Sequence, residues 1–198
     1  KPSGAGVLNA AGPDLPTLLA LVGQLQGMDA ATLKSLNAAL SGVKDKSFSV
    51  ATEFKADGGQ INLPKLNAKL MGNAISGNVA AIPTKGDKPA VKGTVNAKGP
   101  DLPSLLAIAA TFQGPESGLH DMAKSLAKGS NKSFNVDAAF ESDMNQGRID
   151  LSKLSAQGLG LSIDGNLNAN NMASKNGKIN GKLSIKGNQL KDLLTALG

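Results

Sequence analysis

The side chains that most often perform chemistry are scarce in this chain, so their types and spacing limit the reactions that it could catalyse. The 198 residues include one histidine, His120, and no cysteine. A metal site that needs two histidines or a thiolate cannot be built from this set, and we expect His120 to lie on a helix surface. No Gly-x-Ser-x-Gly segment offers a nucleophile. We therefore expect no enzyme, with a hydrolase that uses His120 as the remote alternative.

Carboxylates and glycines occur in patterns that a fold explains without catalysis. Glu53 with Asp57, and Asp137 with Glu141, have the spacing of same-face neighbours on a strand, as on any hydrated sheet. The glycines of segment 72–77 lack the Gly-Lys-Ser/Thr ending of a phosphate-binding loop and precede a strand instead of a helix. We expect neither a metal nor a cofactor.

The composition limits the possible partners. The aromatic share is 3%, with no Trp or Tyr, so stacking platforms for nucleic acid are lacking. The net charge is +6 and the pI about 9.5, but the lysines are scattered singly, which is typical of a solvated surface. No segment approaches the ~20 apolar residues of a membrane span, and residues 1–4 do not resemble a signal peptide. We expect no nucleic-acid partner.

One sequence segment occurs twice and a third, less similar copy begins near the end of the chain. The other expected elements follow these copies in the same order. The copies occupy residues 6–19, 93–106 and, more loosely, 181–194. This period predicts tandem units at 1–92 and 93–180 and the start of a third at 181–198. Because the third copy stops within its expected helix, we expect an excised fragment of a longer repeat protein.

Each unit is expected to contain a strand, two helices and three further strands. Asp14 and Asp101 are expected to cap helices whose leucines recur at i, i+3, i+4 and i+7. Second helices are expected at 29–40 and 119–128, and the third unit should begin another helix near 189–194.

Strict alternation of apolar and polar residues predicts half-buried antiparallel strands at 48–55 and 134–141. The alternation changes phase at 64–65 and 152–153, where a bulge or a break in the strand would return the apolar residues to one face. The expected fold class is α+β, with tandem repeats of antiparallel strands plus a helix pair, joined into an elongated curved sheet with one apolar face.

The apolar side of these strands is the one feature that suggests binding. Its residues either form a core beneath the helices, which the amount of helix in each unit favours, or line a surface that acyl chains could touch. The lipid-facing or core candidates are Phe48, Val50, Phe54, Ile75, Val79, Phe134, Val136, Phe140, Ile163 and Leu167.

These motifs resemble a known family. The pattern Gly-x-Leu/Val-x-Ala-x-Gly-Pro-Asp-Leu-Pro-x-Leu-Leu is followed by Ser-Phe-x-Val, Ile-x-Leu-x-Lys-Leu-x-Ala and Ile-x-Gly-x-Val/Leu-x-Ala, over nearly the whole chain. It is similar to the AsmA family of Gram-negative envelope proteins, in the wider group that includes TamB and bridge-like lipid transfer proteins.

The resemblance implies a non-enzymatic periplasmic segment of a protein anchored in the inner membrane outside this segment. It also implies a role in phospholipid transport between membranes and in outer-membrane assembly or homeostasis, with acyl chains as the partner in an apolar groove. The two helices expected in each unit depart from that picture, since they could fill the groove. The alternative is therefore a structural or protein-binding spacer with a plugged core.

Overall fold

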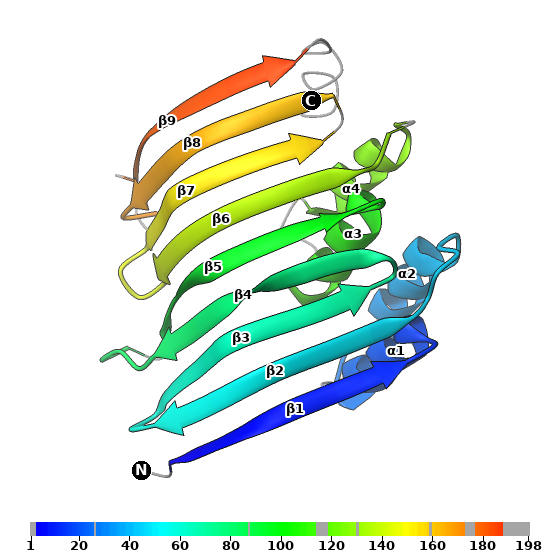
Figure 1. Cartoon of the computed structure of the whole chain (residues 1–198), viewed down its shortest axis with the longest axis horizontal. Coiled ribbons are helices and arrows are strands. Elements are labelled where there is room, and N and C mark those ends of the chain that lie inside the picture. The colour runs from blue at the N-terminus through cyan, green and yellow to red at the C-terminus, as the bar shows by residue number, and fades with distance from the viewer. Residues whose placement is uncertain are drawn as a thin grey trace.

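The protein is described from a computed structural model that covers residues 3–25, 27–86, 88–113, 119–129, 131–158, 160–172 and 177–187. It is built around an open antiparallel sheet of nine strands that lie side by side in chain order (Figure 1). The strands are β1 (Gly4–Gly12), β2 (Phe48–Asp57), β3 (Gln60–Leu70), β4 (Asn73–Ile82), β5 (Ala90–Gly99), β6 (Phe134–Asp143), β7 (Arg148–Gly158), β8 (Leu161–Asn170) and β9 (Lys178–Gly187).

Two helix pairs interrupt the succession of strands. Helices α1 (Leu15–Leu25) and α2 (Ala30–Leu40) connect β1 to β2, and α3 (Leu102–Gln113) and α4 (Leu119–Ala127) connect β5 to β6. The expected mixture of helices with a predominantly antiparallel sheet is confirmed. The helix expected near 189–194 lies outside the described residues.

Aspartate side chains cap three of the helices, as the sequence predicted for α1 and α3. Asp14 accepts hydrogen bonds from the Thr17 backbone N–H at 3.2 Å and from the Thr17 hydroxyl at 2.8 Å. Asp29 accepts the same pair from Thr32, and Asp101 accepts it from Ser104. The hydroxyl and backbone hydrogen bonds favour the ionised carboxylate, so the pKa values of Asp14 and Asp29 are lowered.

These two caps predict how stability will change in acid. An aspartate with a lowered native pKa stabilises the fold above its unfolded pKa of about 3.9, and that stabilisation is lost as the pH falls through the native pKa. The double variant Asp14→Asn/Asp29→Asn keeps side-chain acceptors at both caps but does not titrate there. Urea unfolding between pH 5 and pH 2 should therefore show a shallower loss of stability in the variant than in the parent. Parallel curves would contradict the assignment of the acid sensitivity to these caps.

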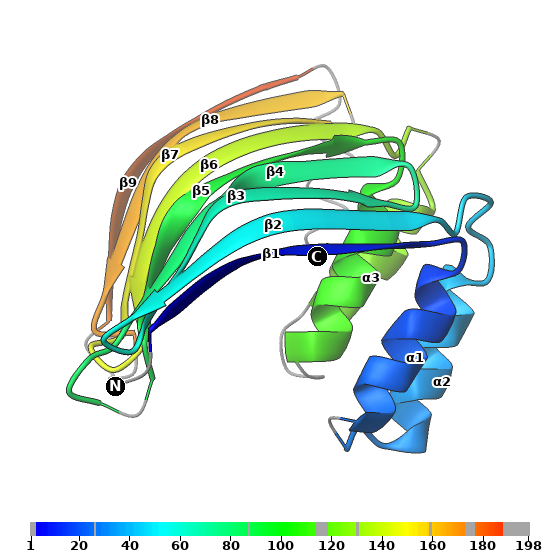
Figure 2. The same ribbon diagram turned by 60° about the horizontal axis from the view of Figure 1, so that its bottom comes forward.

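The helices stand in a row at one end of the strands, on the concave side of the curved sheet (Figure 2). α1 packs on α2, α2 on α3, and α3 on α4. The first pair meets the sheet through a core of Leu15, Leu36, Leu40 and Met71, against which Phe48 and Leu70 also pack. Burial of these side chains supplies the main stabilisation of the helix end of the sheet.

Asn73, at the start of β4, ties the first helix-bearing region to the second. Its side chain is fully buried and donates to the carbonyls of Leu70 and Met71 at 3.1 and 3.2 Å. The side-chain oxygen accepts the backbone N–H of Asp101 at 3.1 Å, immediately before α3. A buried amide that satisfies donors and acceptors on both sides fixes the start of α3 relative to the β3–β4 turn.

The predicted phase changes are confirmed as irregularities of register. Relative to β4, β3 has an extra residue between Leu63 and Leu66, and relative to β8, β7 has one between Leu151 and Leu154. The pairing of β3 with β2 and of β7 with β6 shifts in the same regions. Bulges of this kind bend a strand and increase its local twist. They contribute to the curvature that is visible in Figure 2.

Glycines face both bulges from the next strand. Gly77 pairs with Leu66, and Gly165 pairs with Leu154. A Cβ atom at Gly77 would lie 2.1 Å from the Thr94 carbonyl oxygen, which is part of the β5 backbone and cannot rotate away. The close approach of β4 and β5 therefore depends on glycine at this position.

Substitution at this glycine should be costly. We expect Gly77→Val to lower the free energy of unfolding by at least about 2 kcal/mol, because the new side chain forces two paired backbones apart. Denaturant unfolding followed by circular dichroism measures the change. Gly42→Val is a suitable control, since a Cβ atom there meets nothing within 4 Å. Equal losses in the two variants would show that the close approach at Gly77 is unimportant.

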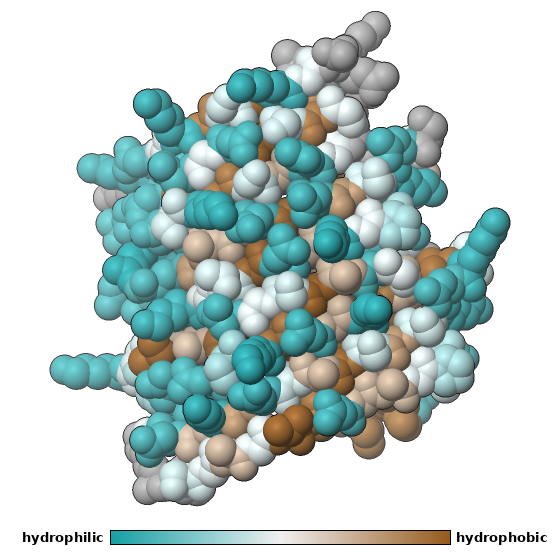
Figure 3. All heavy atoms as spheres, in the orientation of Figure 1, coloured by the Kyte–Doolittle hydropathy of each residue, from teal (hydrophilic) through white to brown (hydrophobic). Residues whose placement is uncertain are grey.

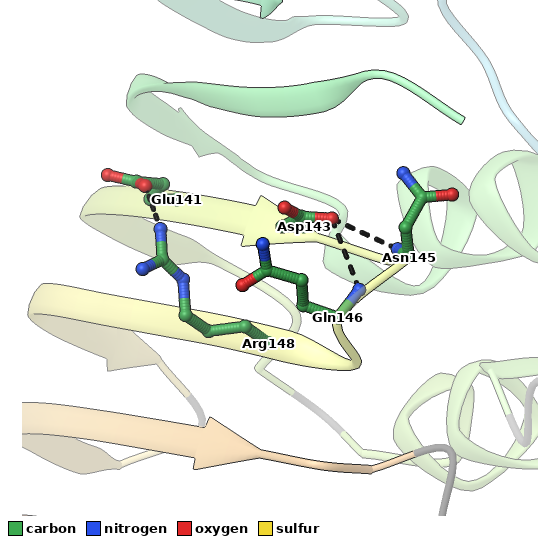
Figure 4. Close-up of polar contacts among 5 residues, drawn as sticks. All are labelled: Glu141, Asp143, Asn145, Gln146 and Arg148. Atoms are coloured by element: carbon green, nitrogen blue, oxygen red, sulfur yellow. Dashed lines mark hydrogen bonds and ion pairs between the residues drawn. The ribbon is translucent and has the colours of Figure 1, made fainter. Parts of the chain in front are cut away.

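At the other end of the strands, the β6–β7 turn is held by polar contacts (Figure 4). Asp143 is buried and accepts the backbone N–H groups of Asn145 and Gln146 at 3.0 and 3.2 Å, and Arg148 forms an ion pair with Glu141. The Asn145 side chain reaches across to the β4–β5 connection, where it donates to the Thr84 hydroxyl at 2.8 Å. Neighbouring turns therefore brace each other at this end.

Candidate functional site

Strand register determines which side chains share a face of the sheet. Directly paired residues point to the same side, and residues along a strand alternate. We call the side that carries Phe48 the helix-side face, because Phe48 packs against the helical core. Three rows of paired residues cross this face: the first two lie on the helix side of the irregularities in β3 and β7, and the third lies beyond them.

Each row can be followed from strand to strand through the pairing. The first consists of Ala10, Val50, Ala68, Ile75, Ala97, Val136, Ala156, Ile163 and Ile185. The second consists of Leu8, Thr52, Leu66, Gly77, Val95, Ala138, Leu154, Gly165 and Leu183. The third runs through Leu63, Val79, Gly93, Phe140, Leu151, Leu167 and Gly181, with Phe54 beside the irregularity next to Leu63.

All ten candidate residues from the sequence lie on this face. Val50, Ile75, Val136 and Ile163 share the first row, and Phe54, Val79, Phe140 and Leu167 belong to the third. Phe48 and Phe134 lie nearer the helix end, paired with Gly12 and Gly99 respectively.

Only part of the helix-side face is packed against helices. Phe134 is buried and Phe48 joins the helical core, whereas Phe54 is 38% exposed and the seven other candidates are half-buried. Ile61 and Leu183 on the same face are 51% and 48% exposed. This differs from the expectation that the helices cover the sheet. The physical reason is that the helices pack mainly on one another, in a row at one end of the strands.

The charged residues of the described strands all lie on the opposite face. Three ion pairs lie there, joining Glu53 to Lys65, Asp137 to Lys153 and Glu141 to Arg148. Figure 3 shows hydrophilic residues spread over this face. Three of the four carboxylates noted in the sequence, those of Glu53, Asp137 and Glu141, thus have a basic partner on an adjacent strand. These side chains are 40–73% exposed, and exposed pairs of this kind contribute little stability.

The described residues provide no group of three or more His, Asp or Glu side chains that could hold a metal ion. His120 lies in α4, and its side chain falls outside the described part of the chain. Among the described residues, no helix combines the length and apolar character that a membrane crossing requires.

The second row shows what sequence reasoning left out of the candidate site. Leu66, Val95 and Leu154 lie between the two rows that hold most of the predicted residues. Their alternation was recognisable in the sequence, but it gave no indication of which strands would be neighbours or how they would align. The cross-strand register supplies that information.

Searches of protein-family models, curated proteins and solved structures found no match to this chain.

Proposed function

We propose that the protein binds the acyl chains of phospholipids along the helix-side face and acts without catalysing a reaction. In this proposal, residues 1–92 and 93–180 are tandem units, the start of a third lies at 181–198, and their strands form one apolar lining. The observation that carries the proposal is the set of three rows that continue from strand to strand with glycine, Thr52 and apolar residues alone.

The energetics favour an acyl chain as the occupant. Each methylene that leaves water for an apolar surface contributes about 0.8 kcal/mol, so a chain lying over several strands gains enough to be held without directional contacts. Phe54, Ile61 and Leu183 are accessible to such a ligand. A phospholipid headgroup, which is costly to desolvate, stays in water at the margin of the face.

We place this activity in the periplasm of a Gram-negative bacterium, in a protein anchored in the inner membrane through a segment outside this chain. The AsmA-like motifs support this placement. Passage of phospholipid between membranes, and through it outer-membrane assembly or homeostasis, is the corresponding physiological role.

The test is uptake of lipid by the purified protein. We expect the protein to acquire phospholipid from detergent micelles or vesicles, measured as a mass increase in native mass spectrometry and as a blue shift of an acyl-labelled fluorescent phospholipid. A water-soluble headgroup analogue without acyl chains should not bind. Absence of uptake, with the protein shown to be folded, would support the structural or protein-binding spacer instead.

A further inference from the structure

The free edge of β1 is exposed but lacks the charged residues and proline that usually protect such an edge. β1 is the first strand of the sheet and pairs with β2, and no other strand in the described ranges lies beyond it. Its nine residues contain no charge and no proline, and Val7 and Leu8 are 67% and 54% exposed. Proteins usually protect a long exposed edge with charged residues or proline, because its free N–H and C=O groups accept further strands. β9, at the opposite edge, carries Lys178, Lys182 and Lys186.

The chain itself contains a template for the strand that this edge would accept. The segment 6–12 of β1 and the segment 93–99 of β5 share glycine at both ends and an Asn-Ala pair in the middle. In β5, the edge that corresponds to the free edge of β1 is covered by β4. Ile75 pairs there with Ala97, Gly77 with Val95, and Val79 with Gly93.

The β4–β5 pairing requires a glycine in β5, and β1 has a glycine at the corresponding position. A Cβ atom at Gly93 would lie 2.1 Å from the Asn78 carbonyl oxygen of β4, so this close approach tolerates no side chain. The corresponding residue of β1 is Gly6. A strand of the β4 type could therefore approach β1 as closely as β4 approaches β5.

We propose that the free edge of β1 is a site for strand addition, and that its occupant is an extended, antiparallel polypeptide segment with the sequence pattern of β4. The register follows from the β4–β5 pairs. The occupant places an apolar residue opposite Ala10, glycine opposite Leu8 and a second apolar residue opposite Gly6. The apolar side chains of the occupant then extend the helix-side face, while its polar side chains lie on the opposite face of the sheet. This inference does not depend on lipid binding.

Disulfide trapping in the intact protein tests both the site and the register. The chain has no cysteine, so Ala10→Cys introduces a single thiol. The probe is a synthetic peptide of residues 73–82 that carries Cys in place of Ile75. In a glutathione redox buffer, the mixed disulfide should accumulate at least about tenfold faster than with a peptide that carries Cys in place of Ser76, since only directly opposed residues bring the sulfur atoms within bonding range.

The matched control is Ile185→Cys on β9. Ile185 corresponds to Ala10 and Ala97 in the repeated segment. The unpaired edge of β9, however, corresponds to the edge of β5 that pairs with β6, and not to the edge that pairs with β4. The β4-type peptide should therefore trap on Ala10→Cys and not on Ile185→Cys. A second register pair, Asn9→Cys with the Ser76→Cys peptide, should trap as well, because Asn96 pairs with Ser76. Equal trapping at both edges, equal trapping by both peptides on Ala10→Cys, or no trapping on any folded variant would overturn the proposal.

Discussion

Replacing Leu36 with alanine will lower the free energy of unfolding by about 2–5 kcal/mol. Leu36 is 1% exposed and belongs to the core that joins the first helix pair to the sheet. Its truncation leaves a cavity between α2 and the residues around Met71, which the surrounding backbone cannot close completely. Urea denaturation followed by circular dichroism measures the loss.

Leu25→Ala is the matched control for this change. It removes the same atoms from a side chain that is 80% exposed at the end of α1. The expected effect is within about 0.5 kcal/mol of zero, because little apolar surface is returned to water. Similar losses in the two variants would mean that the helix–sheet core described for Leu36 does not stabilise the fold.

Two carboxylates on the helix-side face will reduce phospholipid uptake at least about tenfold, because charged groups placed against acyl chains must lose hydration without gaining partners. Ile61→Glu/Leu63→Glu places them there, since Ile61 pairs with Ala81 and Leu63 with Val79 on that face. Ile61 is 51% exposed, so the variant should still fold. Titration with an acyl-labelled phospholipid gives the apparent affinity.

The same strand provides the control for this double variant. Gln60→Glu/Asn62→Glu adds the same charge at interleaved positions, which pair with Asp57 and Lys55 and face away from the helices. We expect its lipid uptake to equal that of the parent protein. If both double variants lost uptake equally, the effect would arise from net charge, and the lipid would not lie on the helix-side face.

The local pattern of the sequence was sufficient to predict most strands and helices. Asp14 and Asp101 preceded helical stripes and do cap α1 and α3. The shift in alternation at residues 64–65 predicted the irregularity in β3. These features depend on residues that are close in the chain, so spacing alone reveals them.

The arrangement of the helices could not be derived in the same way. Their apolar stripes could pack on the sheet or on one another, and the sequence favoured coverage of the sheet. In the structure, Leu15, Leu36 and Leu40 meet Met71 at one end of the strands, leaving Phe54 accessible. The hydrogen bond between Asn73 and Asp101 joins residues that are distant in sequence, and no local sequence pattern predicts such a contact.

The extra residue in β3 affects the bending of the strand, but it is not needed to place the apolar side chains on one face. Leu63 and Leu66 point to the same side because two residues, Pro64 and Lys65, stand between them where the paired strands have one. If either residue were deleted, apolar and polar residues would alternate along β3 without interruption. The apolar side chains would still lie on one face and the polar side chains on the other. The strand would lose the kink, however. Deletion of one of these two residues should therefore flatten the concave side of the sheet at β3, with no change in which side chains line it.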